Sequence, residues 1–104
     1  EPVVIGVPTD QPWLLEDPVR PVMVVPVPSD HAADMVVAYL PQQQVLFNSD
    51  MFSPGFPASF DALLVGATEL QSAIVANGLA VSWMAAGHGG VVPSYAEFLD
   101  QFGF

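Results

Sequence analysis

The sequence predicts a single α/β domain, with strands in the first half of the chain and helices concentrated in the second. Residues 1–56 contain short runs of β-branched and aromatic residues, separated by turns rich in Pro and Asp. From Ser59 onward the apolar residues recur at helical spacing. The chain has 104 residues and no internal repeat or linker, so residues 1–104 are expected to form one domain around one core.

Five strands are expected before the first helix, at residues 3–7, 13–15, 22–27, 34–40 and 45–47. Pro26 lacks the N–H that a ladder needs, so the third of these strands is predicted to lie at a sheet edge or to bulge there. The polar turn between Leu40 and Val45 predicts a hairpin between the last two strands.

A long helix is predicted to follow, with Ser59 capping its start and Gly78 ending it in a left-handed conformation. Residues 81–86 then predict a buried strand, and a last helix follows Pro93 and runs through Phe102. The predicted apolar face of the long helix consists of Phe60, Leu63, Leu64, Ala67, Leu70, Ile74 and Val75.

The chain is strongly acidic. It carries 11 Asp and Glu residues against a single basic residue, Arg20, which gives a formal net charge of −10. Phosphate backbones and anionic lipid surfaces are bound by clustered Lys and Arg side chains. The sequence therefore argues against nucleic-acid and membrane binding, and it leaves cation binding open.

Hydrophobic residues make up 52% of the chain and charged residues only 12%. Because an ordinary domain carries about 25% charged residues, a domain this small has difficulty covering its own surface. We therefore expect a large apolar area to be buried against a partner. That partner is either a second copy, which gives a homodimer, or the N-terminal half of the same fold. The alternative is an unusual composition without such a partner, in a chain with 11 prolines and many valines.

The chain has no cysteine, which excludes disulfides and thiolate zinc ligands. No apolar run reaches the roughly 18 residues of a membrane span, and no secretory leader is recognisable at Glu1. These features favour a soluble, cytoplasmic protein without determining the compartment.

Two histidines and one aspartate lie in predicted loops at strand ends. His31 precedes a strand, whereas Asp50 and His88 each follow one. Imidazole and carboxylate ligands of this kind suit zinc or another divalent metal ion. The alternative is that the histidines are solvated loop side chains and that Asp50 caps a turn.

The sequence around these residues resembles the second half of metallo-β-lactamase-fold hydrolases. The resemblance covers most of residues 18–104 and rests on three motifs in order, DHAADMVVAYLP at 30–41, VLFNSDMFSPG at 45–55 and AGHGG at 86–90. It implies half of an αβ/βα sandwich, with a mixed sheet of five to six strands, a long helix and a C-terminal helix. Half of a sandwich would expose the sheet face that packs on the other half.

The resemblance also implies site roles. His31 would complete the first zinc site as its third histidine, Asp50 would bridge two metal ions, and His88 would be a ligand of the second. Asp34 would orient a ligand by accepting a hydrogen bond from it, or would cap the following strand. In such a pair the metal ions lower the pKa of a bridging water and polarise the bond under attack.

Two departures limit what the chain can do alone. The His-x-His-x-Asp-His motif that supplies the first-half ligands is absent, and Ser49 replaces the usual Gly before the bridging aspartate. A zinc ion normally has three or four protein ligands, so three ligands spread over two ions would hold each weakly.

We therefore expect the C-terminal portion of a metal-dependent hydrolase, catalytic only when the missing half is supplied. Its substrate would contain an ester, thioester, lactam or similar bond. One alternative is a non-catalytic, dimerising half-fold module that binds a small ligand or a metal ion. Another is an α/β domain whose histidines have no function.

Overall fold

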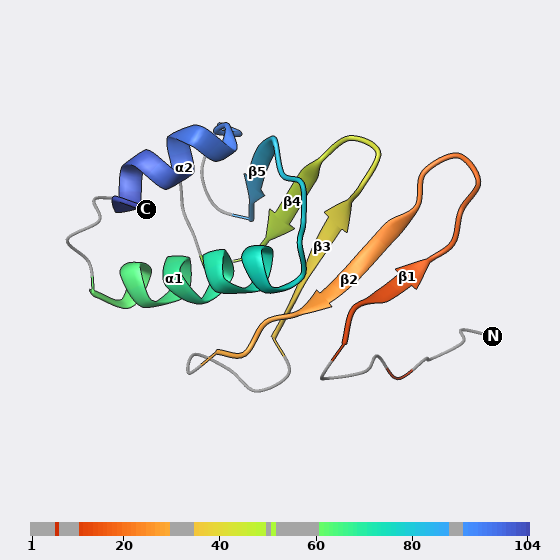
Figure 1. Ribbon diagram of the computed structural model, residues 1–104, viewed down its shortest axis with the longest axis horizontal. Coiled ribbons are helices and arrows are strands. Elements are labelled where there is room, and N and C mark those ends of the chain that lie inside the picture. Colours follow the sequence, from red (N-terminus) through yellow and green to blue (C-terminus); the bar gives the residue numbers. More distant parts are fainter. Residues whose placement is uncertain (1–5, 7–10, 30–34, 50, 52–60, 88–90) are drawn as a thin grey trace.

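A mixed sheet with two helices on one face forms the described part of the chain (Figure 1). The computed structural model describes residues 6, 11–29, 35–49, 51, 61–87 and 91–104. The elements are β1 (Trp13–Leu15), β2 (Val22–Pro26), β3 (Val36–Leu40), β4 (Val45–Asn48), α1 (Asp61–Ala76), β5 (Trp83–Ala86) and α2 (Tyr95–Phe102).

The five strands lie in the order β1-β2-β3-β4-β5. Neighbours from β1 to β4 are antiparallel, whereas β5 lies parallel to β4 after the crossover through α1. This confirms the predicted mixed sheet, its long helix and its C-terminal helix. Of the strand predicted at residues 3–7, only Gly6 is described, and it is not in a strand. The rest of that prediction lies outside the described residues.

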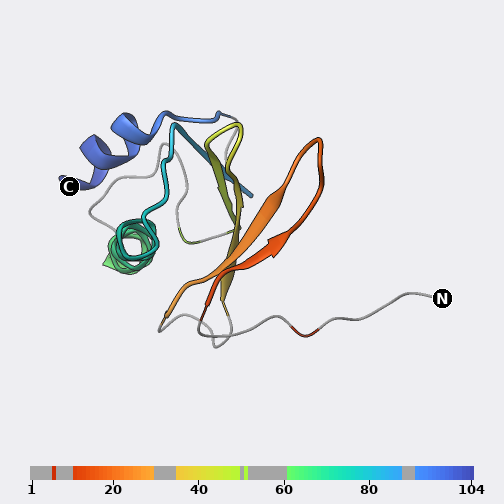
Figure 2. The same ribbon diagram turned by 45° about the vertical axis from the view of Figure 1, so that its right-hand side comes forward.

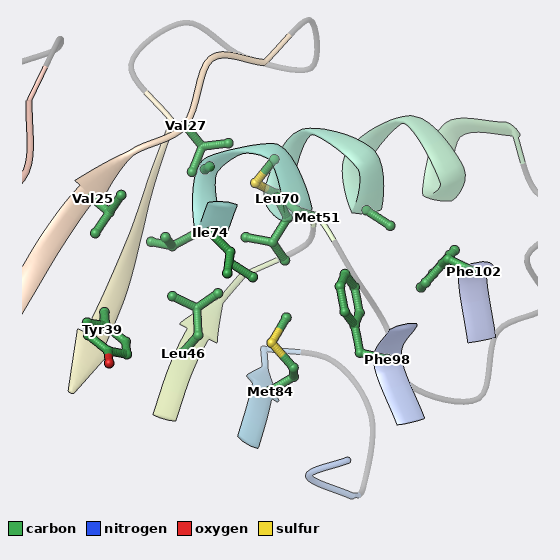
Figure 3. Packing of buried hydrophobic residues seen from close by; sticks show 13 residues of the cluster. Val25, Val27, Tyr39, Leu46, Met51, Leu70, Ile74, Met84, Phe98 and Phe102 are labelled. Atoms are coloured by element: carbon green, nitrogen blue, oxygen red, sulfur yellow. The ribbon is translucent and has the colours of Figure 1, made fainter. Parts of the chain in front are cut away.

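Both helices cover the same face of the sheet (Figure 2). The core between them is built from alternate strand residues, because successive side chains of a strand point to opposite faces. Val25, Val37, Leu46 and Met84 come from β2 to β5, and each is at most 3% exposed. Figure 3 shows Leu46 and Met84 of the sheet beside α1 and Phe98 of α2, and all of these strand residues belong to one buried cluster.

The buried face of α1 is narrower than the sequence predicts. Ala67, Leu70 and Ile74 are buried as expected, but Leu64 is 38% exposed and Val75 is 67% exposed. Their exposure shows that only the stripe through Ala67, Leu70 and Ile74 faces the sheet. The side chains of Phe60 and Leu63, and the predicted cap Ser59, lie outside the description.

Gly78 ends α1 as predicted. Its φ of 61° is left-handed, and its N–H donates to the Val75 carbonyl at 3.1 Å. The next N–H, that of Leu79, donates to the Ile74 carbonyl at 3.0 Å. This pair of bonds is the Schellman motif, and Leu79 packs against the core as that motif favours.

A capping box begins α2. The Ser94 hydroxyl accepts from the Glu97 N–H at 3.1 Å, and the Glu97 carboxylate accepts from the Ser94 N–H at 3.1 Å. The Tyr95 hydroxyl donates to Oε1 of Gln71 at 2.7 Å, which ties α2 to α1.

Among the described residues, no helix is both long enough and apolar enough to cross a membrane.

The prediction that the strand containing Pro26 lies at an edge or bulges is wrong for the strand as a whole, because β2 lies between β1 and β3. The Val27 N–H donates to the Met35 carbonyl beside β3, so the nitrogen of Pro26 faces the other side. On that side β1 has already ended, since Trp13 pairs with Val24. The missing N–H therefore interrupts no ladder.

The turn after β1 is organised by Asp17. Its Oδ1 accepts hydrogen bonds from the N–H groups of Arg20 at 2.9 Å and Val19 at 2.8 Å. These two bonds favour the ionised carboxyl and hold the pKa of Asp17 below its ordinary value.

Phe98 is the central contact between α2 and the sheet, and it is fully buried. Because its removal leaves a cavity, we expect Phe98→Ala to lower the free energy of unfolding by about 3–5 kcal/mol. The matched change Val75→Ala, at an exposed helix position, should alter it by at most about 0.5 kcal/mol. Urea unfolding followed by circular dichroism measures both, and equal effects would contradict this description of the core.

Candidate metal site at the loop end of the sheet

The four residues predicted to build the site, His31, Asp34, Asp50 and His88, all lie outside the described residues. The structure therefore tests where the chain leaves and re-enters the sheet around them. It describes Ser29 and Met35 on either side of His31 and Asp34, and it describes the residues next to Asp50. It also describes Gly87, directly before His88.

Each segment that contains a candidate ligand leaves the sheet at the same end, which we call the loop end. Pro26, the last residue of β2, pairs with Val36, the first residue of β3. Asn48 and Ala86, the last residues of the parallel strands β4 and β5, also pair with each other. The β3–β4 register places Val36 beside the end of β4. Residues that follow β4 and β5 therefore leave the sheet on the side where β3 begins (Figure 1).

The residues before Asp50 and His88 are in direct contact. The Gly87 N–H donates to the carbonyl of Asn48 at 2.9 Å and to that of Ser49 at 3.1 Å. A Cβ at position 87 would lie only 2.8 Å from the Ser49 carbonyl oxygen. Glycine is thus required for this approach, which brings the exits of β4 and β5 within one hydrogen bond of each other.

The residue after Asp50 is held from the other side. Met51 is 3% exposed and packs in the core, and its backbone lies against α1 at Gly66. A Cβ at position 66 would lie 2.6 Å from the Met51 carbonyl oxygen. Ser49 and Met51, the described residues on either side of Asp50, are therefore both held by close backbone contacts.

Asn48 braces the same region. It is 1% exposed, and its Nδ2 donates to the Ala85 carbonyl at 3.1 Å. Since a buried amide must be hydrogen-bonded, this side chain couples the end of β4 to β5.

The roles of Asn48 and Gly66 were not predicted from the sequence. A signal existed for Gly66, because a glycine inside a helical pattern usually has a packing reason. Asn48 carried no signal of its own, because a polar residue at a strand end is expected in any case. Its burial depends on β5, which lies 37 residues away along the chain.

No three His, Asp or Glu side chains come together within the described ranges.

A groove of about 470 Å³ lies beside α1 in the described part of the chain. Its lining residues are Gln11, Pro12, Pro26, Pro28, Thr68, Glu69, Ser72, Ala73, Ala76 and Asn77. Glu69 in this lining accepts a hydrogen bond from the Ser29 hydroxyl at 3.0 Å.

Neither a protein-family model nor a curated protein matches the chain in sequence. Solved structures do match. A metallo-β-lactamase from Pontibacter korlensis superposes with a TM-score of 0.64 at 20% identity, over 90% of this chain and 45% of that one. The DIM-1 metallo-β-lactamase gives 0.58 at 19% identity, over 89% and 44%. The chain has part of the metallo-β-lactamase fold.

A flavodiiron protein from Giardia intestinalis also matches, with a TM-score of 0.59 at 18% identity, over 95% of this chain and 28% of that one. The name metallo-β-lactamase refers to a metal, and the name flavodiiron protein refers to a pair of iron ions. This chain spans less than half the length of each. The metallo-β-lactamase fold predicted from the three sequence motifs is thereby confirmed, and at these identities the likeness concerns the fold.

The close approach of Met51 to Gly66 predicts that alanine at position 66 destabilises the fold. Alanine is favoured over glycine inside a helix by about 1 kcal/mol, but its Cβ would press on the backbone of Met51. We expect the steric cost to exceed that gain, so that Gly66→Ala lowers the free energy of unfolding by about 1–3 kcal/mol. Gly87→Ala, which has no helical gain, should lower it by at least as much.

Gly6→Ala is the matched control, because no atom lies within 4 Å of the Cβ that it adds. It should change the free energy of unfolding by less than about 0.5 kcal/mol in the same urea titration. A stabilised Gly66→Ala variant would mean that helix propensity outweighs the contact with Met51.

Proposed function

We propose that this chain is the C-terminal portion of a metal-dependent hydrolase of the metallo-β-lactamase type, incomplete or inactive when alone. The observation that supports this most directly is the contact between Gly87 and Ser49, the residues before His88 and Asp50. Two segments far apart in sequence leave the sheet side by side, and each continues into a residue that can bind a metal ion. The segment between β2 and β3, which contains His31, joins the same end of the sheet.

The proposed ligands are His31, Asp50 and His88. Asp50 would bridge two zinc or similar divalent ions, with His31 on the first ion and His88 on the second, and Asp34 would orient a ligand. Bound metal supplies an activated water and polarises the bond under attack. The part of this chain in that chemistry would be to hold the ligands in place, and Asn48, Gly66 and Gly87 would do so by fixing Ser49 and Met51 on either side of Asp50.

Three protein ligands are too few for two well-held zinc ions. In the proposal, the N-terminal portion of the fold supplies the remaining ligands and the other wall of the active site. Hydrolysis of an ester, thioester, lactam or similar bond would then need both portions. The 104-residue chain alone is expected to bind zinc weakly and to leave such substrates unhydrolysed.

Zinc affinity of the purified chain tests the ligand set. Competition with a chromophoric chelator should show that His31→Ala, Asp50→Ala and His88→Ala each weaken binding at least tenfold, or about 1.4 kcal/mol. Asp50→Ala should have the largest effect, because it removes the proposed bridge between both ions.

The control is Asp100→Ala, at an exposed position on α2. It removes one negative charge, as Asp50→Ala does, but it lies away from the loop end. It should weaken binding less than twofold, and circular dichroism should show that all variants remain folded. Equal losses in Asp50→Ala and Asp100→Ala would show that zinc is attracted only by the net charge of −10.

A non-catalytic, dimerising module is the second candidate, and the exposed aromatic residues of the sheet favour it. Phe47 and Trp83 are 44% and 49% exposed on strands β4 and β5. A small ligand of such a module has a place in the groove between Pro26, Pro28 and α1. This candidate replaces the first if the folded chain takes up no zinc and the His31→Ala and His88→Ala variants behave like the original chain.

A further inference from the structure

The sheet face turned away from the helices consists of apolar residues in every described strand. These residues alternate with the buried core residues, and directly paired residues of neighbouring strands share a face. The open face, as we call it, comprises Trp13, Leu15, Val22, Val24, Pro26, Val36, Ala38, Leu40, Val45, Phe47, Trp83 and Ala85. An antiparallel sheet with one face in water normally alternates apolar and polar residues, and this one does not.

Several of these residues are exposed to an unusual degree. Leu15, Val36, Phe47 and Trp83 are between 43% and 49% exposed. Aromatic side chains of this size carry about 150–250 Å² of surface, so Phe47 and Trp83 present on the order of 100 Å² each. Together with their aliphatic neighbours they form a patch of the few hundred Å² that marks an interaction site.

The shape of the open face is suited to packing against the open face of a second copy of the chain. The registers place Trp13, Val24, Ala38, Phe47 and Ala85 in one row across all five strands. The ring of Phe47 therefore stands between two alanines, as a ridge with a shallow position on either side. Facing sheets interdigitate their side chains, so the ridge of one copy fits a shallow position of the other.

The charge distribution also permits self-association. The chain carries a net charge of −10, which would oppose pairing of two copies through an acidic surface. The open face contains no charged residue. The acidic residues whose side chains are described lie in the turn after β1, on α1 and on α2, namely Glu16, Asp17, Glu69, Glu97 and Asp100.

We propose that the 104-residue chain forms a two-fold homodimer by packing the open faces of two copies against each other. Such an interface is isologous, with the same patch on both sides. A stable dimer buries about 800 Å² per partner, and the open face supplies on the order of half of that. We therefore expect a dissociation constant on the order of micromolar. The N-terminal portion of the fold would compete for the same face, so the two partners exclude each other.

The first test is the mass of the chain against concentration, measured by sedimentation equilibrium with a chelator present. The proposal rests on the sheet face alone, so its outcome is independent of metal binding and of the proposed hydrolase. The mass should rise from 11.0 kDa toward twice that value with increasing concentration. Salt should strengthen the dimer, because it screens the repulsion between two acidic chains.

Phe47→Glu should raise the dissociation constant more than tenfold, whereas Val75→Glu should leave it unchanged. Val75 is the matched control, since it is an exposed valine on α1, away from the open face. A folded chain that stays monomeric at several hundred micromolar would overturn the proposal. So would a dimer that Val75→Glu weakens as much as Phe47→Glu does.

A second measurement needs no substitution and remains decisive if Phe47→Glu fails to fold. In a mixture of isotope-labelled and unlabelled chains, filtered nuclear Overhauser spectra report only contacts between copies. The proposal predicts such contacts between the Phe47 ring and methyl groups of Val24, Val36 or Val45. Intermolecular contacts confined to α1 or α2 would assign the dimer to another surface and overturn it.

Discussion

Two close approaches of backbone to backbone hold Ser49 and Met51, the described residues on either side of Asp50. The Ser49 carbonyl lies against Gly87, and the Met51 carbonyl lies against Gly66. A side chain at either glycine would push Ser49 away from the end of β5 or Met51 away from α1. The contacts of the residue after β4 with β5, and of Met51 with α1, therefore both require glycine.

The two faces of the sheet differ in what covers them. The helix-covered face is closed by Phe98 and by the buried stripe of α1, and it accounts for the stability of the described part. The opposite face is as apolar but exposes Phe47 and Trp83. The apolar surplus of the sequence is thus found on the open face as well as in the core, and the partner that we propose would cover the open face without contacting the core.

Much of this fold follows from local patterns. The hairpin of β3 and β4, the end of α1 at Gly78 and the start of α2 are set by neighbouring residues, so the sequence predicts them. The exposure of Val75 and the interior position of β2 depend on how α1 packs on the sheet and on where β1 pairs, which no local pattern contains.

The candidate site could likewise be predicted from the sequence only in part. Its residue types and loop positions could be read from the sequence, and the motifs in order indicated the fold. The proximity of Ser49 and Gly87 arises from the register of parallel strands separated by a helix, and such a register is specified only by the packed structure. The burial of Asn48 has the same origin.

We propose that the loop end brings both histidines of the chain to one metal site. Because the chain contains only His31 and His88, its long-range proton–nitrogen spectrum shows just two imidazoles, and a zinc titration reports on each. The account predicts that both imidazoles change over the same range of added zinc, and that both changes disappear in Asp50→Ala. Two imidazoles that keep their signals in excess zinc, in a chain that remains folded, would contradict it.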